Sequence, residues 1–165
     1  ERDLELVQGV ATAIVRHPRP VLAAVHGWTV GAGFEWAMDA DVVLAADDAR
    51  FKLPEASLGV FVTGGLVATL PAAAGLPRAK ALMLLGEAFD AGQAVDWGLV
   101  HRAVPRAQLD EVSMAACRQL AALEPAVVAR YKRVLNAVGL ERFDRAIEEE
   151  SHATRALTKA DPPRA

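Results

Sequence analysis

Two glutamates and a glycine-rich turn are the residues of this sequence best suited to chemistry. Gly27, Gly31 and Gly33 stand directly before Glu35, and Glu55 follows further along the chain. Because glycine has no Cβ, such a turn lets the backbone approach a ligand closely and point its amides outward. If a helix begins here, its unpaired N–H groups suit an oxygen that develops negative charge. The pattern predicts an oxyanion site with two acid–base groups beside it.

Each glutamate also has a purely structural interpretation. A glutamate in the first turn of a helix is favoured by the macrodipole, and Glu55, which follows Leu-Pro at the start of a loop, can simply face water. Function is favoured by the setting of the pair, since both Glu35 and Glu55 stand in small, apolar, glycine-rich segments next to predicted buried strands. Burial there raises carboxyl pKa values toward those useful for proton transfer at neutral pH.

Other chemistries have weaker support in the sequence. Gly31-x-Gly33 matches the first two positions of a dinucleotide-binding fingerprint, but Trp36 stands where the third glycine is required. The four histidines, at positions 17, 26, 101 and 152, lack metal-ligand spacing, and no serine lies in a nucleophile elbow. We therefore predict no metal site and no serine hydrolase.

Composition narrows the class of protein. With 165 residues, 53% hydrophobic and 24% charged, the chain is expected to form one globular unit with a core. The net charge of −3 and the lack of a basic patch argue against a nucleic-acid partner. No apolar run approaches the roughly 18 to 20 residues of a membrane span, and no signal sequence is evident, so we predict a cytoplasmic protein without membrane contact. The first residues, ERD, resemble the middle of a helix, which predicts a fragment or a processed product.

The hydrophobic pattern predicts an α/β region followed by an all-helical one. It indicates a helix to about residue 16, buried strands at 21–25 and 42–46, and a helix at 34–39 between those strands. A short strand at 50–53, helices after Gly65 and at 77–85, a short helix capped by Asp90 and a strand at 98–104 complete the first region. From residue 105 onward the pattern is helical, and the last helix, at about 141–158, has only a thin apolar stripe.

The sequence resembles the crotonase superfamily of enoyl-CoA hydratases and isomerases. The matching blocks occur in the family's order and spacing: 20–27 (PVLAAVHG), 31–35 (GAGFE), Asp41, 49–51 (ARF), 53–55 (LPE), 58–59 (LG), 79–80 (AK), 84–86 (LLG) and 97–100 (WGLV). The resemblance implies a spiral of ββα units followed by helices that form trimers. Residues 1–104 would be a partial spiral core with the active-site loops, and residues 105–165 the C-terminal helical trimerisation region. It also implies that the N-terminal part of the fold lies upstream of residue 1, and that the protein is a homotrimer or a dimer of trimers.

The resemblance implies an acyl-CoA thioester as substrate, with no separate cofactor and no metal, because coenzyme A is part of the substrate. By the family pattern, the backbone N–H of Ala32 donates to the thioester oxygen, and a second amide comes from upstream of residue 1. Glu35 would assist the attack of water at C3, and Glu55 would deliver a proton to C2. The presence of both acids favours hydration of a trans-2-enoyl-CoA to a 3-hydroxyacyl-CoA, or the reverse dehydration.

The acyl group and two alternatives stay open. The resemblance places five residues at the substrate: Gly31, Gly33, Phe61, Thr63 and Gly64. After Glu55 the family usually has a run of small residues, whereas this sequence has the bulkier segment 60–66 (VFVTGGL). A double-bond isomerase, which usually keeps one acid, is the first alternative. A non-catalytic subunit that binds acyl-CoA or serves assembly is the second, motivated by this altered segment and the helical tail.

Overall fold

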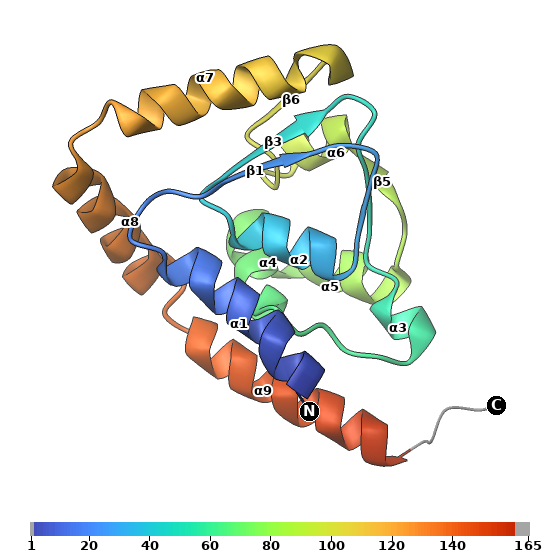
Figure 1. The fold of residues 1–165 in the computed structure, drawn as a ribbon. Coiled ribbons are helices and arrows are strands. Elements are labelled where there is room, and N and C mark those ends of the chain that lie inside the picture. The colour runs from blue at the N-terminus through green and yellow to red at the C-terminus, as the bar shows by residue number, and fades with distance from the viewer. Residues whose placement is uncertain (1, 161–165) are drawn as a thin grey trace.

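The structure, a computed structural model, describes residues 2–160. Within that range the strands form two small three-stranded sheets surrounded by helices (Figure 1). In the first sheet β3 (Val42–Ala46) lies between β1 (Leu22–Val25) and β6 (Arg102–Val104), and all pairs are parallel. In the second, β4 (Arg50–Lys52) pairs in parallel with β2 (Trp28–Val30) and antiparallel with β5 (Phe89–Asp90). The α/β fold class is confirmed.

The order strand, strand, helix occurs twice along the chain. β1 and β2 are followed by α2 (Ala32–Asp39), and β3 and β4 are followed by α3 (Glu55–Leu58). Equivalent strands pair with each other, with Leu22 opposite Val42 in one sheet and Trp28 opposite Arg50 in the other. As a result, the exits of β2 and β4 lie together, and the amide of Gly31 donates to the carbonyl oxygen of Lys52 at 3.3 Å.

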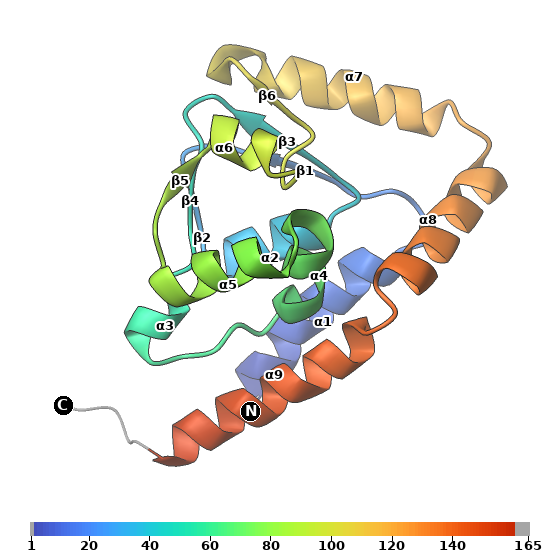
Figure 2. The same ribbon diagram turned by 180° about the vertical axis from the view of Figure 1, so that it is seen from behind.

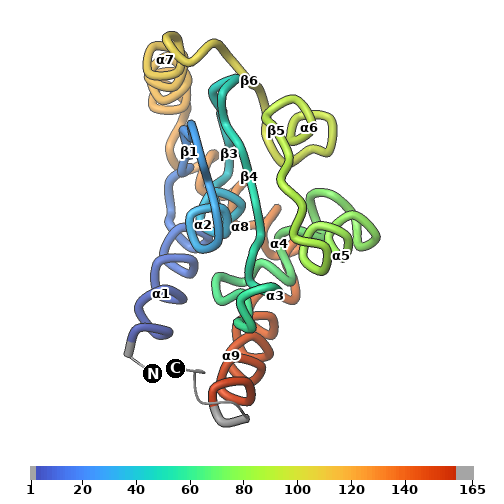
Figure 3. The backbone as a smooth tube through the Cα atoms, turned by 90° about the vertical axis from the view of Figure 1, so that its right-hand side faces the viewer, coloured from blue at the N-terminus to red at the C-terminus, as the bar shows by residue number. Residues whose placement is uncertain are grey.

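Helices cover both sides of this framework. α4 (Leu66–Ala74), α5 (Leu76–Leu85) and α6 (Ala91–Asp96) lie behind the sheets in Figure 1 and in front in Figure 2. A short 3₁₀ turn (Arg106–Gln108) then leads to α7 (Leu109–Ala121), which packs on β1 and β3, and to α8 (Pro125–Gly139). The side view in Figure 3 shows α7 at one end of the molecule, with α3 and the last helix, α9 (Phe143–Ala160), toward the other.

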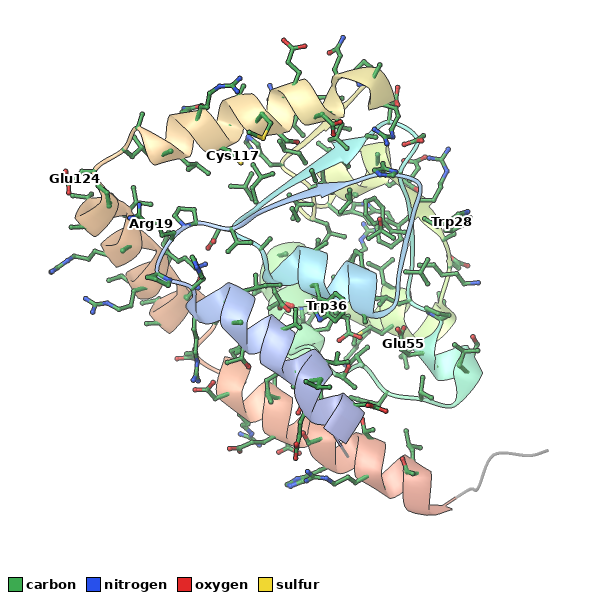
Figure 4. All side chains as sticks on the ribbon, in the orientation of Figure 1. Arg19, Trp28, Trp36, Glu55, Cys117 and Glu124 are labelled. Carbon is green, nitrogen blue, oxygen red and sulfur yellow. The ribbon has the colours of Figure 1, made fainter. Side chains whose placement is uncertain are left out.

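Aromatic rings fill the core between the sheets and α4 to α6. The ring of Phe34 meets those of Phe51 and Phe89 edge-on, with centroids 5.8 Å apart in both cases, and the rings of Phe51 and Phe89 stack at 5.2 Å. Edge-on and stacked pairs are the arrangements that ring quadrupoles favour. Two residues further along α2, Trp36 packs instead against the cluster of Ala11 and Phe143 (Figure 4). α2 is therefore held from both sides, which fixes the helix that carries Glu35.

The two ends of the described chain lie side by side. α1 (Arg2–Arg16) runs antiparallel to α9, as Figures 1 and 2 show. The side-chain amide of Gln8 donates to the Ile147 carbonyl oxygen at 3.3 Å and to Ser151 Oγ at 2.8 Å, while Arg16 pairs with Asp144. The thin apolar stripe of the last helix is thus covered, at least in part, within this chain.

A buried lysine ties α8 to the start of the first sheet. Lys132 Nζ donates to Asp41 Oδ2 at 2.7 Å, to the Ile14 carbonyl oxygen at 2.8 Å and to the Arg19 carbonyl oxygen at 3.3 Å. These three acceptors satisfy the three donors of an ammonium group. Lys132 is therefore held inside the protein, whereas its neighbours Arg130 and Arg133 on α8 are exposed.

Several predicted elements need correction. Only Arg102–Val104 of the predicted strand 98–104 is a strand, because the amides of Leu99 and Val100 donate back to the Ala94 carbonyl oxygen and close α6. Glu55 begins α3 rather than a loop. The short strands β2 and β5 were not predicted. No helix within residues 2–160 has the length and apolar character needed to span a bilayer.

Candidate active site

Glu35 projects from the first turn of α2 into the protein. Gly31, with φ 56°, caps this helix, and its carbonyl oxygen accepts hydrogen bonds from the amides of Phe34 at 2.9 Å and Glu35 at 3.0 Å. A side chain at Gly31 would be strained by that positive φ. The Glu35 side chain is 2% exposed, and its Oε2 accepts from the amides of Thr63, at 2.8 Å, and Gly64. The carboxylate is therefore held by the loop between α3 and α4.

The close approach of Glu35 explains the glycine at position 64. A Cβ on Gly64 would lie 2.9 Å from Glu35 Oε2 and 3.1 Å from Glu35 Cβ. Both distances are shorter than ordinary contacts, so any larger residue would push the carboxylate away from the amides. Thr63 and Gly64, which the family resemblance places at the substrate, hold Glu35 through their backbone.

Glu55 also adjoins Gly31. It is the first residue of α3, and a Cβ on Gly31 would lie 3.0 Å from Glu55 Oε1. Its other oxygen, Oε2, is buried without a hydrogen-bond partner. Figure 4 shows Glu55 near the end of α2 that begins at Ala32. Gly31 thus joins the two acids: its carbonyl oxygen accepts from the Glu35 amide, and its missing side chain leaves room for the Glu55 carboxylate.

Burial gives the two acids the electrostatics of a proton-transfer pair. Desolvation raises the pKa of Glu35; the amides of Thr63 and Gly64 lower it in part, and the charge of Glu55 raises it again. Desolvation also raises the pKa of Glu55, against a smaller lowering by its own backbone hydrogen bond. Because the charge of Glu55 raises the pKa of Glu35, an ionised Glu55 makes Glu35 a stronger base. Such a pair can take a proton at one carboxyl group and release one at the other.

The start of α2 supplies amides next to these acids. Ala32 and Gly33 are the first two residues of the helix, so their N–H groups have no acceptor within it and point outward with the positive end of its dipole. Gly33 is exposed, and Phe61, in the loop that carries Thr63, is 36% exposed. The structure therefore brings Gly31, Ala32, Gly33, Glu35, Glu55, Thr63 and Gly64 together, whereas Phe61 lies toward solvent on the adjoining loop.

Sequence reasoning missed two buried acids behind the site. Glu150 of α9 is 0% exposed, and its oxygens accept from the amides of Gly65 at 2.7 Å and Val67 at 2.9 Å, at the start of α4. Burial raises its pKa to about 7. Asp39, the last residue of α2, is 5% exposed, and burial, followed by the charges of Glu35 and Glu150, raises its pKa to about 8. A signal for Glu150 was its place seven residues after Phe143 on the apolar stripe of its helix.

Concave surface elsewhere has a different character. A cavity of about 580 Å³ lies where the end of α1 meets α8 and the start of α9, and its lining includes Arg16, Arg130, Lys132 and Arg133 but neither Glu35 nor Glu55. Within residues 2–160, no group of three or more His, Cys, Asp or Glu side chains is arranged to hold a metal ion. We therefore place the candidate active site at the two glutamates and the start of α2.

The fold and the family comparison together define the crotonase class. The family model described as enoyl-CoA hydratase/isomerase matches residues 4–162, and the chain belongs to this family. An enoyl-CoA hydratase structure from Mycobacterium avium subsp. paratuberculosis K-10 is similar with a TM-score of 0.92 and 30% identity, over 98% of this chain and 65% of that one. An enoyl-CoA hydratase/isomerase structure from Pseudoalteromonas atlantica T6c has a TM-score of 0.86 and 30% identity, over 92% and 61% of the two chains.

Curated relatives agree on the family. Carnitinyl-CoA dehydratase from Citrobacter koseri is 36% identical over 126 residues, which are 76% of this chain and 48% of that protein. The protein of the same name from Escherichia coli K12 is 36% identical over 123 residues, or 74% and 47% of the two. The chain thus spans about half the length of the curated relatives it matches.

Proposed function

We propose that this chain carries the acid–base machinery of an acyl-CoA lyase, which hydrates a trans-2-enoyl-CoA to a 3-hydroxyacyl-CoA or catalyses the reverse dehydration. The observation that carries the proposal is that both Glu35 and Glu55 adjoin Gly31, at the amino end of α2. Family membership supports a thioester of coenzyme A as the substrate class.

The proposed hydration uses each carboxyl group once. Glu35, as a carboxylate, takes a proton from water while the water oxygen bonds to C3. The C2=C3 electron pair moves toward the thioester carbonyl and forms an enolate, whose oxygen accepts a hydrogen bond from the Ala32 amide. Glu55, as the acid, donates its proton to C2. The proton gained by Glu35 then replaces the one lost by Glu55, which restores both carboxyl groups, whose pKa values are raised by burial, to their starting states.

We extend the proposal to the fold of the whole protein. The repeated order strand, strand, helix supports assigning residues 1–104 to a partial spiral core. The second oxyanion amide would then come from the part of the family fold upstream of residue 1. We assign residues 105–165 to a trimerisation region, supported by exposed apolar side chains on one face of α8: Val127, Tyr131, Val134, Leu135 and Val138. Light scattering on the full-length protein should report a trimer or a dimer of trimers, and a well-behaved monomer would contradict this assignment.

The test of function uses the full-length protein and a panel of enoyl-CoA and 3-hydroxyacyl-CoA thioesters. Loss of the conjugated enoyl absorbance measures hydration. Glu35→Gln and Glu55→Gln should each lower kcat by about 100-fold or more, which is the range for removing a general acid or base. Glu148→Gln, an exposed glutamate of α9, is the matched control and should leave the rate unchanged. Wild-type turnover in both site variants would refute the mechanism.

The same panel separates the two alternatives. A double-bond isomerase would act on 3-enoyl-CoA and tolerate Glu35→Gln better than Glu55→Gln. A non-catalytic subunit would bind acyl-CoA in a calorimeter without turning over any thioester of the panel.

A further inference from the structure

Asp39, a third buried acid besides Glu35 and Glu150, lies one helical turn after Glu35 on α2, and within residues 2–160 its carboxyl oxygens have no hydrogen-bond partner. Asp39 and Glu35 are four residues apart on α2, a spacing that places their Cβ atoms about 5–6 Å apart on one face of a helix. The side chain is 5% exposed, and both of its oxygens are buried without a partner. An ionised carboxylate in such a place is costly because nothing replaces the water it has lost.

The other two buried acids, Glu35 and Glu150, accept hydrogen bonds from nearby backbone amides. The segment 63–67 donates the amides of Thr63 and Gly64 to Glu35, and those of Gly65 and Val67 to Glu150. Each of these carboxylates therefore has two donors that stabilise its charged form, while Asp39 has none. Among the three acids, Asp39 is the one that keeps a proton at the least cost.

The surroundings of Asp39 do not offset a negative charge there. Of the elements with the main contacts to α2, α4 and β2 contain no ionisable residue, and the ionisable residues of α1 whose side chains are described, Asp3, Glu5 and Arg16, are exposed. Burial is the largest cause of the raised pKa of Asp39, which is about 8, and the negative charges of Glu35 on its own helix and Glu150 on α9 raise it further.

We propose that Asp39 is a positioning residue for Glu35: it remains a neutral acid behind the site, so that Glu35 can be the charged carboxylate that the amides of 63–64 hold and that takes the proton from water. The role given to Glu35 rests on the proposed hydration. Ionisation of Asp39 places a negative charge one helical turn from Glu35 and weakens its charged state. Asp39 thereby sets the upper pH limit for the working form of the site.

The first experiment detects the proton on Asp39 without any enzyme assay. Full-length wild-type protein is labelled with carboxyl-¹³C aspartate, and the infrared C=O stretch of a protonated aspartic acid is followed with pH. We expect this band at pH 7, its loss as the pH passes about 8, and its absence in Asp39→Asn. Asp96→Asn, which changes an exposed aspartate of α6, should keep the band. A wild-type protein without a protonated aspartate at pH 7 would overturn the proposal, and this result needs no variant that folds.

The second experiment links that proton to Glu35. Asp39→Asn imitates the neutral acid in shape, so kcat at pH 7 should stay within about tenfold of wild type. The pH profile of kcat in the wild type should contain an alkaline ionisation near pH 8 that Asp39→Asn lacks, with Asp96→Asn again as control. A purely structural Asp39 would leave the shape of the profile unchanged, and that outcome refutes the proposal. A wild type that turns over no thioester refutes the proposed function instead, and the infrared band then decides the protonation of Asp39.

Discussion

Gly64→Ala tests whether the backbone of the loop between α3 and α4 positions Glu35. The new Cβ would lie 2.9 Å from Glu35 Oε2 and 3.1 Å from Glu35 Cβ. Ordinary carbon contacts are about 3.5–4.0 Å, so the two groups must separate by roughly half an ångström or more. Gly64 has no left-handed φ, so the substitution acts by space alone. Overpacking of this kind costs about 1–3 kcal/mol of stability.

The larger effect is expected on the reaction. Displacing Glu35 weakens its bonds to the amides of Thr63 and Gly64 and moves the base relative to the substrate. Since a misplacement of about 1 Å can cost about 100-fold, we expect kcat to fall by about 10- to 100-fold, with a smaller change in KM. Steady-state kinetics of the full-length protein and urea unfolding measure the two effects separately.

A double-mutant cycle locates the cause. If Gly64→Ala acts through the Glu35 carboxylate, it should have little further effect on kcat in a Glu35→Gln background. Gly9→Ala in α1 is the matched control, because no atom lies within 4 Å of its new Cβ; it should keep the activity and gain stability by up to about 1 kcal/mol. Wild-type kcat in Gly64→Ala, or a full and additive loss in the Glu35→Gln background, would refute the reasoning.

Two further predictions concern stability. The pKa of Asp39 rises from 3.8 to about 8 on folding, so the folded state binds more protons between these values and the free energy of unfolding falls as the pH rises through that window. Asp39→Asn should remove this pH dependence, and at pH 8 its free energy of unfolding in urea should exceed that of the wild type by a few kcal/mol. Equal pH dependence in the two proteins would contradict the raised pKa of Asp39. Lys132→Met should destabilise the protein by about 3 kcal/mol, because it removes the buried ammonium group that binds Asp41 and two backbone carbonyl oxygens; with Asp41→Asn already present, the loss should be smaller.

Local patterns were enough to predict β1, β3 and α2, but not α3, which carries Glu55. The buried strands β1 and β3 are short apolar runs, and α2 follows a glycine turn, so each is specified by neighbouring residues. The sequence also predicts that Glu35 and Glu55 act as a pair of acid–base groups, because both stand in segments of unusual composition. At Gly31 the sequence signal and the structural constraint lie on the same residue, because the missing side chain leaves room for the Glu55 carboxylate.

Short elements were missed because they have no periodicity to detect. β2 and β5 contain three and two residues, and they are strands only because β4 runs between them. In the predicted strand 98–104, only residues 102–104 form a strand, and the first part was wrong although its residues are apolar. Leu99 and Val100 are apolar and buried, as a strand residue would be, but their amides complete the end of α6. Burial of a short apolar run does not distinguish these two uses.

The acids behind the site depend on contacts that no local pattern contains. The sequence pattern predicts that a helix begins after Gly65, and α4 does begin there. That role alone does not explain why both positions 64 and 65 are glycine. Gly64 leaves room for Glu35 of α2, and a Cβ on Gly65 would overlap the ring of Phe143, more than seventy residues away on α9. The same turn then distributes its amides between Glu35 and Glu150. Because α2 and α9, which are far apart along the chain, converge on this turn, the ionisation of the site depends on the whole fold, and the part of the chain that the structure describes offers Asp39 no hydrogen-bond donor.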